Sequence, residues 1–362
     1  MPGTYIESFK EPASLAFKPN PTHRTHTPLF NDNFTPRYLY RLVAPQSAGT
    51  TNSSTVVPPI VEGCTKDIFQ LPAPEAANLL LKHLLWQRGH ETSCNLMSWT
   101  SSLLFALQYA LYRHRKDGDD LRNIHLIILD TTLFPAGTFI QDMEIMRAFQ
   151  AADYRLQKFV EFRESEYYFG EYLTQGRLAI QNRCVCTSIQ RMVDLGLFDL
   201  QPALADKTQW QWWPKRVLVF REQFETERCV LTSDADVETA VGMARQCFGG
   251  DWVVPGAIML LALQPRKRDD AVIIQGLKAR FSLSEIRRVG LHRVKIDARR
   301  LPEVGQFKEL LQSVQRSYAL AEYDSLVHSA QSLSVGRPMV HEGLQCTAGV
   351  MRIEEAAKLE QE

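Results

Sequence analysis

The sequence has no long apolar run and no excess of charge of either sign. Nowhere are there enough consecutive apolar residues to cross a bilayer, and the N-terminus lacks the basic stretch and apolar run of a signal peptide. Lysine and arginine together number 41, as do aspartate and glutamate, so no net field attracts nucleic acid or an anionic membrane. These absences predict an intracellular, cytoplasmic protein without a membrane partner.

Several familiar catalytic and metal-binding motifs are also missing. There is no glycine-rich phosphate loop, no His-Glu-x-x-His helix and no Gly-x-Ser-x-Gly turn. The seven cysteines are odd in number and widely spread, which favours reduced thiols over a disulfide framework. Cys184 and Cys186 lie close together, but no second pair or histidine stands at ligand spacing. We therefore expect small buried thiols here and no metal.

Changes in composition divide the chain into four parts. Residues 1–33 are rich in proline, threonine and asparagine without apolar periodicity, which predicts a flexible arm. Residues 34–214 mix short apolar runs with amphipathic segments and predict an α/β to α+β domain, a mixed sheet with flanking helices. Residues 215–332 are expected to form a helical lobe that begins with one apolar strand at 216–220. Residues 333–362 are expected to form a mostly flexible tail.

Apolar periodicity places the elements of the α/β domain. It predicts strands at 38–43, 96–100 and 124–129, further short strands around Leu178 and Val185, and helices at 75–87, 103–117 and 142–160. Ser101 or Ser102 is expected to cap the helix at 103–117, which follows the second strand. The basic end of this helix, Arg113–Lys116, is expected to face outward. The run at 124–129 is polar only at His125, so it predicts a strand covered on both faces.

Three segments carry polar residues that an apolar strand or turn does not need. Arg41 has apolar neighbours and therefore requires an anion, either a carboxylate or a bound phosphate. Ser98 and Thr100 share one face of a strand just before a helix N-terminus, so their hydroxyls contact a ribose or amide, or else bond nearby backbone. Glu171 follows an aromatic turn, where a carboxylate can bind a ribose hydroxyl and stabilise an oxocarbenium-like transition state.

This order of arginine, Ser-x-Thr before a helix, and glutamate resembles the mono-ADP-ribosyltransferase fold, with its arginine, Ser-Thr-Ser and glutamate. The resemblance implies that Arg41 binds a phosphate of NAD, that Ser98 and Thr100 line the nicotinamide ribose pocket, and that Glu171 is the catalytic carboxylate.

The sequence departs from that pattern in the middle motif and before the glutamate. The middle motif reads Ser98-Trp99-Thr100, and Phe169 stands where arginine- or asparagine-directed members carry Glu or Gln two places before the catalytic acid. Glu164 and Glu166 are close enough in sequence to compete with Glu171 for the catalytic role.

A second resemblance covers more of the chain. From Pro36 through the helical lobe the sequence resembles a large family of uncharacterised filamentous-fungal proteins. The motifs that carry it are Pro-Arg-Tyr-Leu-Tyr-Arg at 36–41, Ser-Trp-Thr-Ser-Ser-Leu-Leu-Phe-Ala-Leu-Gln-Tyr-Ala at 98–110 and Tyr-Phe-Gly-Glu-Tyr-Leu at 168–173. The resemblance implies a fungal source and assigns no chemistry.

Together these patterns predict a fungal transferase of the ADP-ribosyl type that uses NAD as co-substrate and an unknown protein or small-molecule acceptor. A catalytically inactive interaction module on the same fold is one alternative, favoured by Phe169. A second is an enzyme of secondary metabolism that uses another activated donor such as aminoacyl-tRNA. Nucleic acid could bind through the basic residues around Arg266 and Arg287 in the helical lobe, although acids interleave with them and favour a solvated face.

Overall fold

The computed structural model describes residues 14–19, 35–59, 66–85, 94–226, 229–290 and 300–335. The chain forms two compact units, residues 1–318 and 319–362. The predicted sheet domain and most of the predicted helical lobe fall within the first unit. In the second unit the described residues are the C-terminal part of helix α13 (Pro302–Val335), which exposes Leu320, Tyr323 and Leu326. Across the described segments, no helix combines the length and apolar content needed to cross a membrane.

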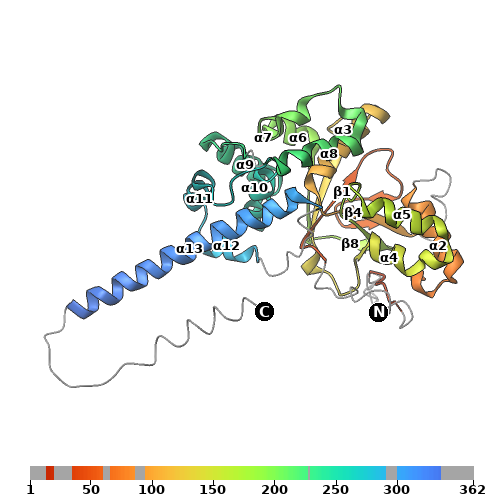
Figure 1. Ribbon diagram of the computed structural model, residues 1–362, viewed down its shortest axis with the longest axis horizontal. Coiled ribbons are helices and arrows are strands. Elements are labelled where there is room, and N and C mark those ends of the chain that lie inside the picture. The colour runs from red at the N-terminus through yellow and green to blue at the C-terminus, as the bar shows by residue number, and fades with distance from the viewer. Residues whose placement is uncertain are drawn as a thin grey trace, which may run out of the picture. The chain divides into compact units, whose positions relative to one another are not determined.

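A six-stranded sheet forms the centre of the first unit (Figure 1). Its strand order is β6 (Ile140–Gln141), β7 (Glu171–Gln175), β4 (Leu96–Thr100), β1 (Tyr38–Val43), β5 (His125–Asp130) and β9 (Cys184–Ser188). Each pair of neighbouring strands is antiparallel, so the prediction of a mixed sheet was wrong. The reason is topological: β4, α3 (Leu103–Asp117) and β5 form a crossover with parallel strands, but β1 lies between them and runs opposite to both.

A smaller sheet covers one face of this central sheet. It consists of β2 (Thr50–Thr51), β3 (Thr55–Val57) and β8 (Leu178–Ala179). Val56 and Leu178 of the small sheet pack in one core cluster with Leu39, Trp99 and Ile127 of the central sheet. The face of β1 and β4 that carries these apolar side chains is therefore closed.

Helices cover the other face in two groups. The helices α2 (Ala73–Leu84), α4 (Asp142–Phe149) and α5 (Tyr154–Glu164) pack with the β7 side of the sheet, in a cluster that includes Leu96 and Leu173. The second group packs with the β1 and β5 side, in a cluster that includes Tyr40 and Ile128. It comprises α3, α6 (Ile189–Asp194), α7 (Leu197–Leu200), α8 (Trp213–Glu225), α9 (Asp234–Cys247), α10 (Val253–Leu261), α11 (Ala271–Lys278), α12 (Leu283–Arg288) and the start of α13. The predicted helical C-terminal region is thus confirmed.

The local signals around α3 are confirmed. The hydroxyl of Ser102 accepts a hydrogen bond from the backbone N–H of Phe105, so it caps the helix. Gly118 ends the helix in the left-handed conformation at φ 75°. Leu104 and Leu107 between them are fully buried, as the apolar stripe predicts.

Four local predictions were wrong. Residues 216–220 belong to helix α8, not to a strand, because Val217, Phe220 and Arg221 are buried at helical spacing. The predicted helix at 142–160 is two helices, α4 and α5, separated by a 3₁₀ turn at Gln150–Ala152. Residues 14–19 of the predicted flexible arm contact the core, since Leu15 bridges to Gln175 and Phe17 is buried. Cys186, expected to be buried, is exposed on β9, while Cys184 is partly buried.

Candidate functional site

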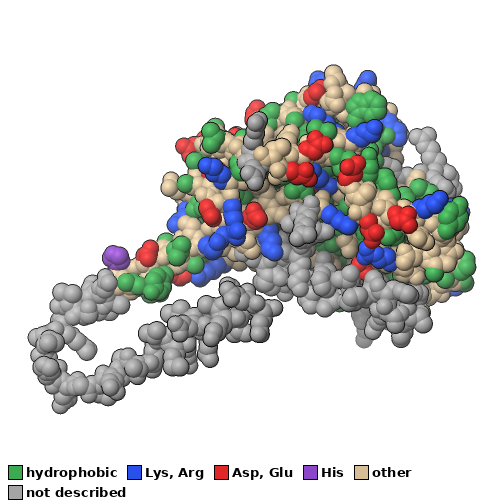
Figure 2. Space-filling model, viewed as in Figure 1, with side chains coloured by type: hydrophobic (Ala, Val, Ile, Leu, Met, Phe, Trp, Pro, Cys, Tyr) green, Lys and Arg blue, Asp and Glu red, His purple; other side chains and the backbone are tan. Residues whose placement is uncertain are grey.

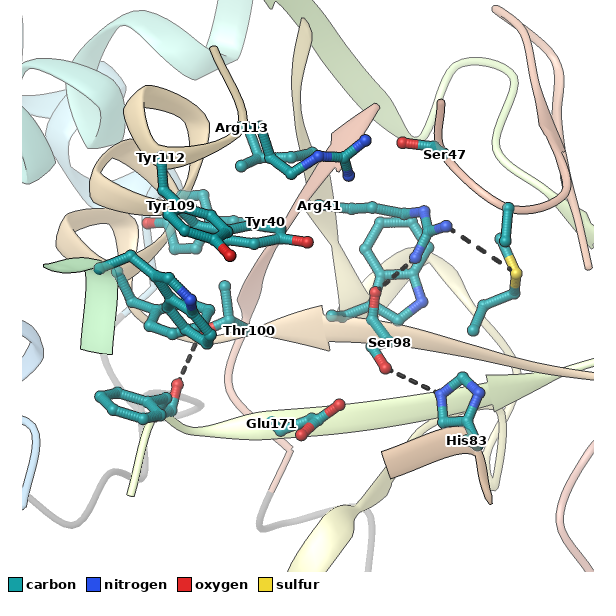
Figure 3. A pocket seen from close by; sticks show the side chains of 18 of the residues that line it. Tyr40, Arg41, Ser47, His83, Ser98, Thr100, Tyr109, Tyr112, Arg113 and Glu171 are labelled. Atoms are coloured by element: carbon teal, nitrogen blue, oxygen red, sulfur yellow. Dashed lines mark hydrogen bonds between the residues drawn. The ribbon is translucent and has the colours of Figure 1, made fainter. Parts of the chain in front are cut away.

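The central sheet is interrupted between β1 and β4. Strand β1 pairs with β5 at six positions, from Tyr38 to Val43, but its pairing with β4 is a single position, Tyr40 opposite Thr100. Past that position the strands diverge, and a cavity of about 520 Å³ lies there between the two helical groups (Figure 3). Arg41, Ser98, Thr100 and Glu171 all line it, so the structure brings the four predicted site residues together.

Arg41 reaches into the gap between the diverging strands. Its Nη1 donates a hydrogen bond of 2.7 Å to the backbone oxygen of Ser98, and its guanidinium lies 5.9 Å from the ring centre of Trp99. Its buried Nε has no hydrogen-bond partner, and in the described part of the chain no carboxylate forms an ion pair with it. Burial lowers the pKa of Arg41 to about 10 because the charged form is poorly solvated. The guanidinium therefore has the capacity to bind an anion in the cavity.

Ser98 is hydrogen-bonded to a histidine that the sequence did not single out. The Ser98 hydroxyl lies 2.9 Å from Nε2 of His83, which projects from α2 (Figure 3). Nδ1 of His83 lies 3.1 Å from the sulfur of Cys94. A signal was present in the sequence, since His83 is a polar residue between the apolar positions Leu80 and Leu84 of an amphipathic helix.

Thr100 has a structural role at the cavity wall. Its hydroxyl donates a hydrogen bond of 2.6 Å to the backbone oxygen of Phe169 and accepts one of 3.1 Å from the N–H of Ser102. Of the two roles open to it, this hydroxyl thus takes the backbone-bonding one. It fastens the end of β4 to the turn that precedes Glu171.

Glu171 lies directly opposite Thr100 in the β4–β7 ladder, so both side chains leave the same face of the sheet. Its Oε2 is 2.7 Å from Nη2 of Arg163, whose Nε is 3.5 Å from the fully buried Asp142. Burial raises the pKa of Asp142 to about 7; Arg163 opposes this shift and Glu171 adds to it. The Arg163 guanidinium thus lies within ion-pair distance of two carboxylates, Asp142 and Glu171.

The competing glutamates do not reach the cavity. Glu164 is paired with Arg147 at 2.6 Å, and Glu166 is exposed on the turn after α5. Neither side chain lines the cavity, whereas Glu171 does. The geometry therefore selects Glu171 among the three acids.

Aromatic rings from distant parts of the chain form one wall of the cavity. Phe105 stacks on Phe169 with ring centres 4.7 Å apart, and Tyr109 lies 5.2 Å from Trp213. Tyr112 continues this wall along α3. Such rings provide flat apolar surfaces on which a planar ligand can stack.

Cations lie beside the aromatic wall on the same helix. Arg113 is 5.9 Å from the ring centre of Tyr109, and Lys116 is 5.3 Å from that of Tyr112. Both residues line the cavity, so the expectation that the basic end of this helix simply faces outward was wrong. Asp117 pairs with Arg113 and partly offsets its charge.

The helical region holds the turn that carries Glu171. Arg221 of α8 donates a hydrogen bond of 2.6 Å to the backbone oxygen of Tyr168 and pairs at 2.9 Å with Glu303 of α13. Glu303 also accepts a hydrogen bond from Ser102, the cap of α3. Arg221 and Glu303 are both buried, so this network fixes the backbone of the turn.

The basic residues proposed for nucleic-acid binding are largely engaged in the fold. Arg266 is buried, where it pairs with Asp236 and donates to the backbone oxygen of Leu261. Arg288 pairs with Asp251 on the surface. On the face shown in Figure 2, Lys and Arg side chains are interspersed with Asp and Glu. Several of the later basic residues, at 291–299, lie outside the described residues.

Residues 34–191 match the model of a protein family that is described as a domain of unknown function (DUF7587). The matched segment runs from before β1 to past β9, so it contains the whole central sheet and the four predicted site residues. It is consistent with the expected membership of an uncharacterised family. No curated protein and no solved structure gave a significant match.

Proposed function

We propose that this protein is a transferase of the mono-ADP-ribosyl type that uses NAD as co-substrate. The observation that carries the proposal is the adjacency of β1, β4 and β7, which brings Arg41, Ser98 and Glu171 around one cavity. Its volume of about 520 Å³ lies within the range of about 300–1,000 Å³ typical of small-molecule sites.

Each part of NAD has a complementary group in the cavity. The buried guanidinium of Arg41 provides a counter-ion for the diphosphate. The aromatic wall around Tyr109 and Trp213 provides a stacking surface for a base or the nicotinamide ring. Ser98 provides a hydroxyl for the ribose, on the same strand face as Thr100 and opposite Glu171.

Glu171 supplies the electrostatic part of the reaction. When the bond from the ribose carbon to nicotinamide breaks, its electron pair leaves with the nicotinamide ring and positive charge develops on the sugar. A carboxylate held close to that carbon stabilises this charge more in the transition state than in the bound substrate. The acceptor then bonds to the sugar carbon and loses a proton.

Calorimetric titration with NAD, followed by measurement of nicotinamide release in the same sample, tests the proposal. Binding with release supports it. Binding without release would favour the inactive interaction module, and no binding would overturn NAD as the ligand. In the last case another activated donor becomes the better explanation of the cavity.

Two matched substitutions test the catalytic assignment. Glu171→Gln keeps the volume and removes the charge, so nicotinamide release should fall on the order of 100-fold or more while NAD still binds. Glu166→Gln makes the same chemical change on an exposed residue outside the cavity, and release should not change. Equal loss in both variants, or no loss in either, would contradict the role of Glu171.

A further inference from the structure

The hydroxyl of Ser98 and the imidazole of His83 form a pair that binding of a dinucleotide does not require. Their 2.9 Å separation is within hydrogen-bond reach, and both side chains are partly exposed where they line the cavity. A hydroxyl next to a histidine is the arrangement in which proteins activate serine as a nucleophile, provided that a third group orients the histidine.

Cys94 is that third group. Its sulfur lies 3.1 Å from Nδ1 of His83, on the side of the ring away from Ser98, and the thiol is buried. The Cys94 thiol donates to the backbone oxygen of Leu96 at 3.9 Å, so its sulfur can accept from Nδ1–H of His83. In that tautomer Nε2 faces the Ser98 hydroxyl as the acceptor (Figure 3). The three side chains come from the end of α2, the residues before β4 and β4 itself, all of them well-packed elements.

Charge around the pair suits nucleophilic attack. Ser98, Thr100 and Glu171 leave the same face of the sheet, so the Glu171 carboxylate, which is paired with Arg163, lies on the side of β4 that carries the Ser98 hydroxyl. On the other side, Arg41 donates to the backbone oxygen of the same Ser98 and lacks a carboxylate partner in the described part of the chain.

We propose that Ser98 is a nucleophile activated by His83, and that the cavity carries out acyl transfer from esters whose acyl group is negatively charged. The Ser98 oxygen bonds to the ester carbonyl carbon while its proton passes to Nε2 of His83. The bond to the alcohol then breaks, and His83 returns the proton to the departing oxygen. Water or another hydroxyl removes the acyl group from Ser98 by the same steps in reverse.

Arg41 selects for the negative charge. An anionic group at the far end of the acyl chain pairs with its guanidinium, while the aromatic wall accommodates the alcohol part. Acyl transfer by Ser98 uses no NAD, so it can be tested independently of the proposed transferase function.

Labelling of the full chain with a fluorophosphonate tests for the nucleophile. The Ser98 oxygen should displace fluoride and form a bond to phosphorus, and peptide mass spectrometry should locate the adduct on Ser98. This measurement needs no variant. An adduct on a different residue, or no adduct, overturns the proposal whatever the result with NAD.

The role of His83 is tested by the rate of labelling. His83→Gln should slow it on the order of 100-fold or more. In the parent, labelling should fall in acid because a protonated imidazole cannot accept the serine proton, and the variant should lose this dependence. His125→Gln and Ser165→Ala, which change residues outside the cavity, should label at the parental rate. Equal rates for His83→Gln and the controls, with all proteins folded by circular dichroism, overturn the proposal.

Substrate charge is tested with two nitrophenyl esters of similar size. The succinate half-ester carries a carboxylate and should react on the order of 10-fold faster, as kcat/KM, than the neutral butyrate ester. Arg41→Gln should remove this preference while both esters still react. A preference for the neutral ester in the parent would overturn the assigned substrate class.

Discussion

The guanidinium of Arg163 lies 2.7 Å from the carboxylate of Glu171, and this ion pair joins helix α5 to the first residue of β7. Both side chains are largely buried, with exposed fractions of 11% and 14%. The same guanidinium contacts Asp142 at 3.5 Å, so its removal leaves two buried carboxylates without their cation. Arg163 therefore supports both the fold and the position of the proposed catalytic acid.

Replacement of Arg163 by Met should destabilise the protein by about 3–5 kcal/mol, because the carboxylates stay buried and unpaired. Urea unfolding monitored by circular dichroism measures the change. Arg155→Met is the matched control, since its partner Asp153 forms an ion pair at the surface and little change is expected. Similar losses in the two variants would show that the Arg163 pairs do not contribute as argued.

The unfolding free energy should fall as pH rises from about 4 to about 7, because of Asp142. Burial raises its pKa from 3.8 to about 7, so the folded state holds the proton more tightly than the unfolded chain. Protonated Asp142 contributes its full stabilisation below the pKa of the unfolded chain, 3.8, and this stabilisation is lost as pH rises through the pKa of the folded state, about 7. Asp142→Asn keeps the oxygen that accepts from the Met143 N–H and removes the titration.

Urea unfolding between pH 4 and pH 7 checks this prediction. The parent should lose up to about 4 kcal/mol more than Asp142→Asn across that range. Asp153→Asn provides a contrast, because Arg155 lowers the pKa of Asp153 and its contribution has the opposite sign. Parallel pH curves for the parent and Asp142→Asn would refute the assignment.

Neutralising Glu303 should destabilise the protein and displace the Glu171 turn. In Glu303→Gln the buried Arg221 loses its counter-charge, which should cost about 3–5 kcal/mol. The bond from Arg221 to the Tyr168 backbone then loses its fixed geometry, so nicotinamide release should also fall. Asp251→Asn breaks an exposed pair with Arg288 and should cost less than about 1 kcal/mol. Thermal unfolding and the release assay together distinguish the two variants.

Gly170 should tolerate no side chain. Its φ is 65°, and a Cβ would lie 2.1 Å from the Ser101 hydroxyl and 2.9 Å from Leu301. Gly118 has a similar φ of 75° but open space around it, so Gly118→Ala incurs only the backbone cost. Gly170→Ala should therefore lose about 1–3 kcal/mol more than Gly118→Ala in urea unfolding. Equal losses of unfolding free energy in the two variants would show that Ser101 and Leu301 move aside at little cost.

Features that depend on neighbouring residues could be predicted from the sequence. The cap at Ser102, the stop at Gly118 and the short strand before α3 follow from local chemistry and spacing. The run at 216–220 was misassigned because its apolar residues fit both a short strand and one helix face. Arg221 continues the buried helix face of Val217 and Phe220, and its partner Glu303 lies 82 positions away, where no local pattern indicates it.

The site could be predicted only in part, because contacts between segments far apart in the sequence complete it. Arg41, Ser98 and Glu171 are polar residues in apolar segments, a pattern that is visible in one sequence. The pairing of Thr100 with the Phe169 backbone and of Ser98 with His83 depends on strand register and on the approach of α2. The aromatic wall joins Phe105 to Trp213, and no local pattern indicates that these rings meet.

The guanidinium of Arg41 has no carboxylate counter-ion among the described residues, and this makes the melting temperature an indicator of the ligand. The folded protein keeps a dehydrated cation whose charge is unmatched in the described residues, so it is less stable empty than with an anion in place. An anion that binds the folded state at 100 times its dissociation constant adds about 2.7 kcal/mol of stability. A thermal-shift screen of small anions can therefore search for the natural substrate before any reaction is known.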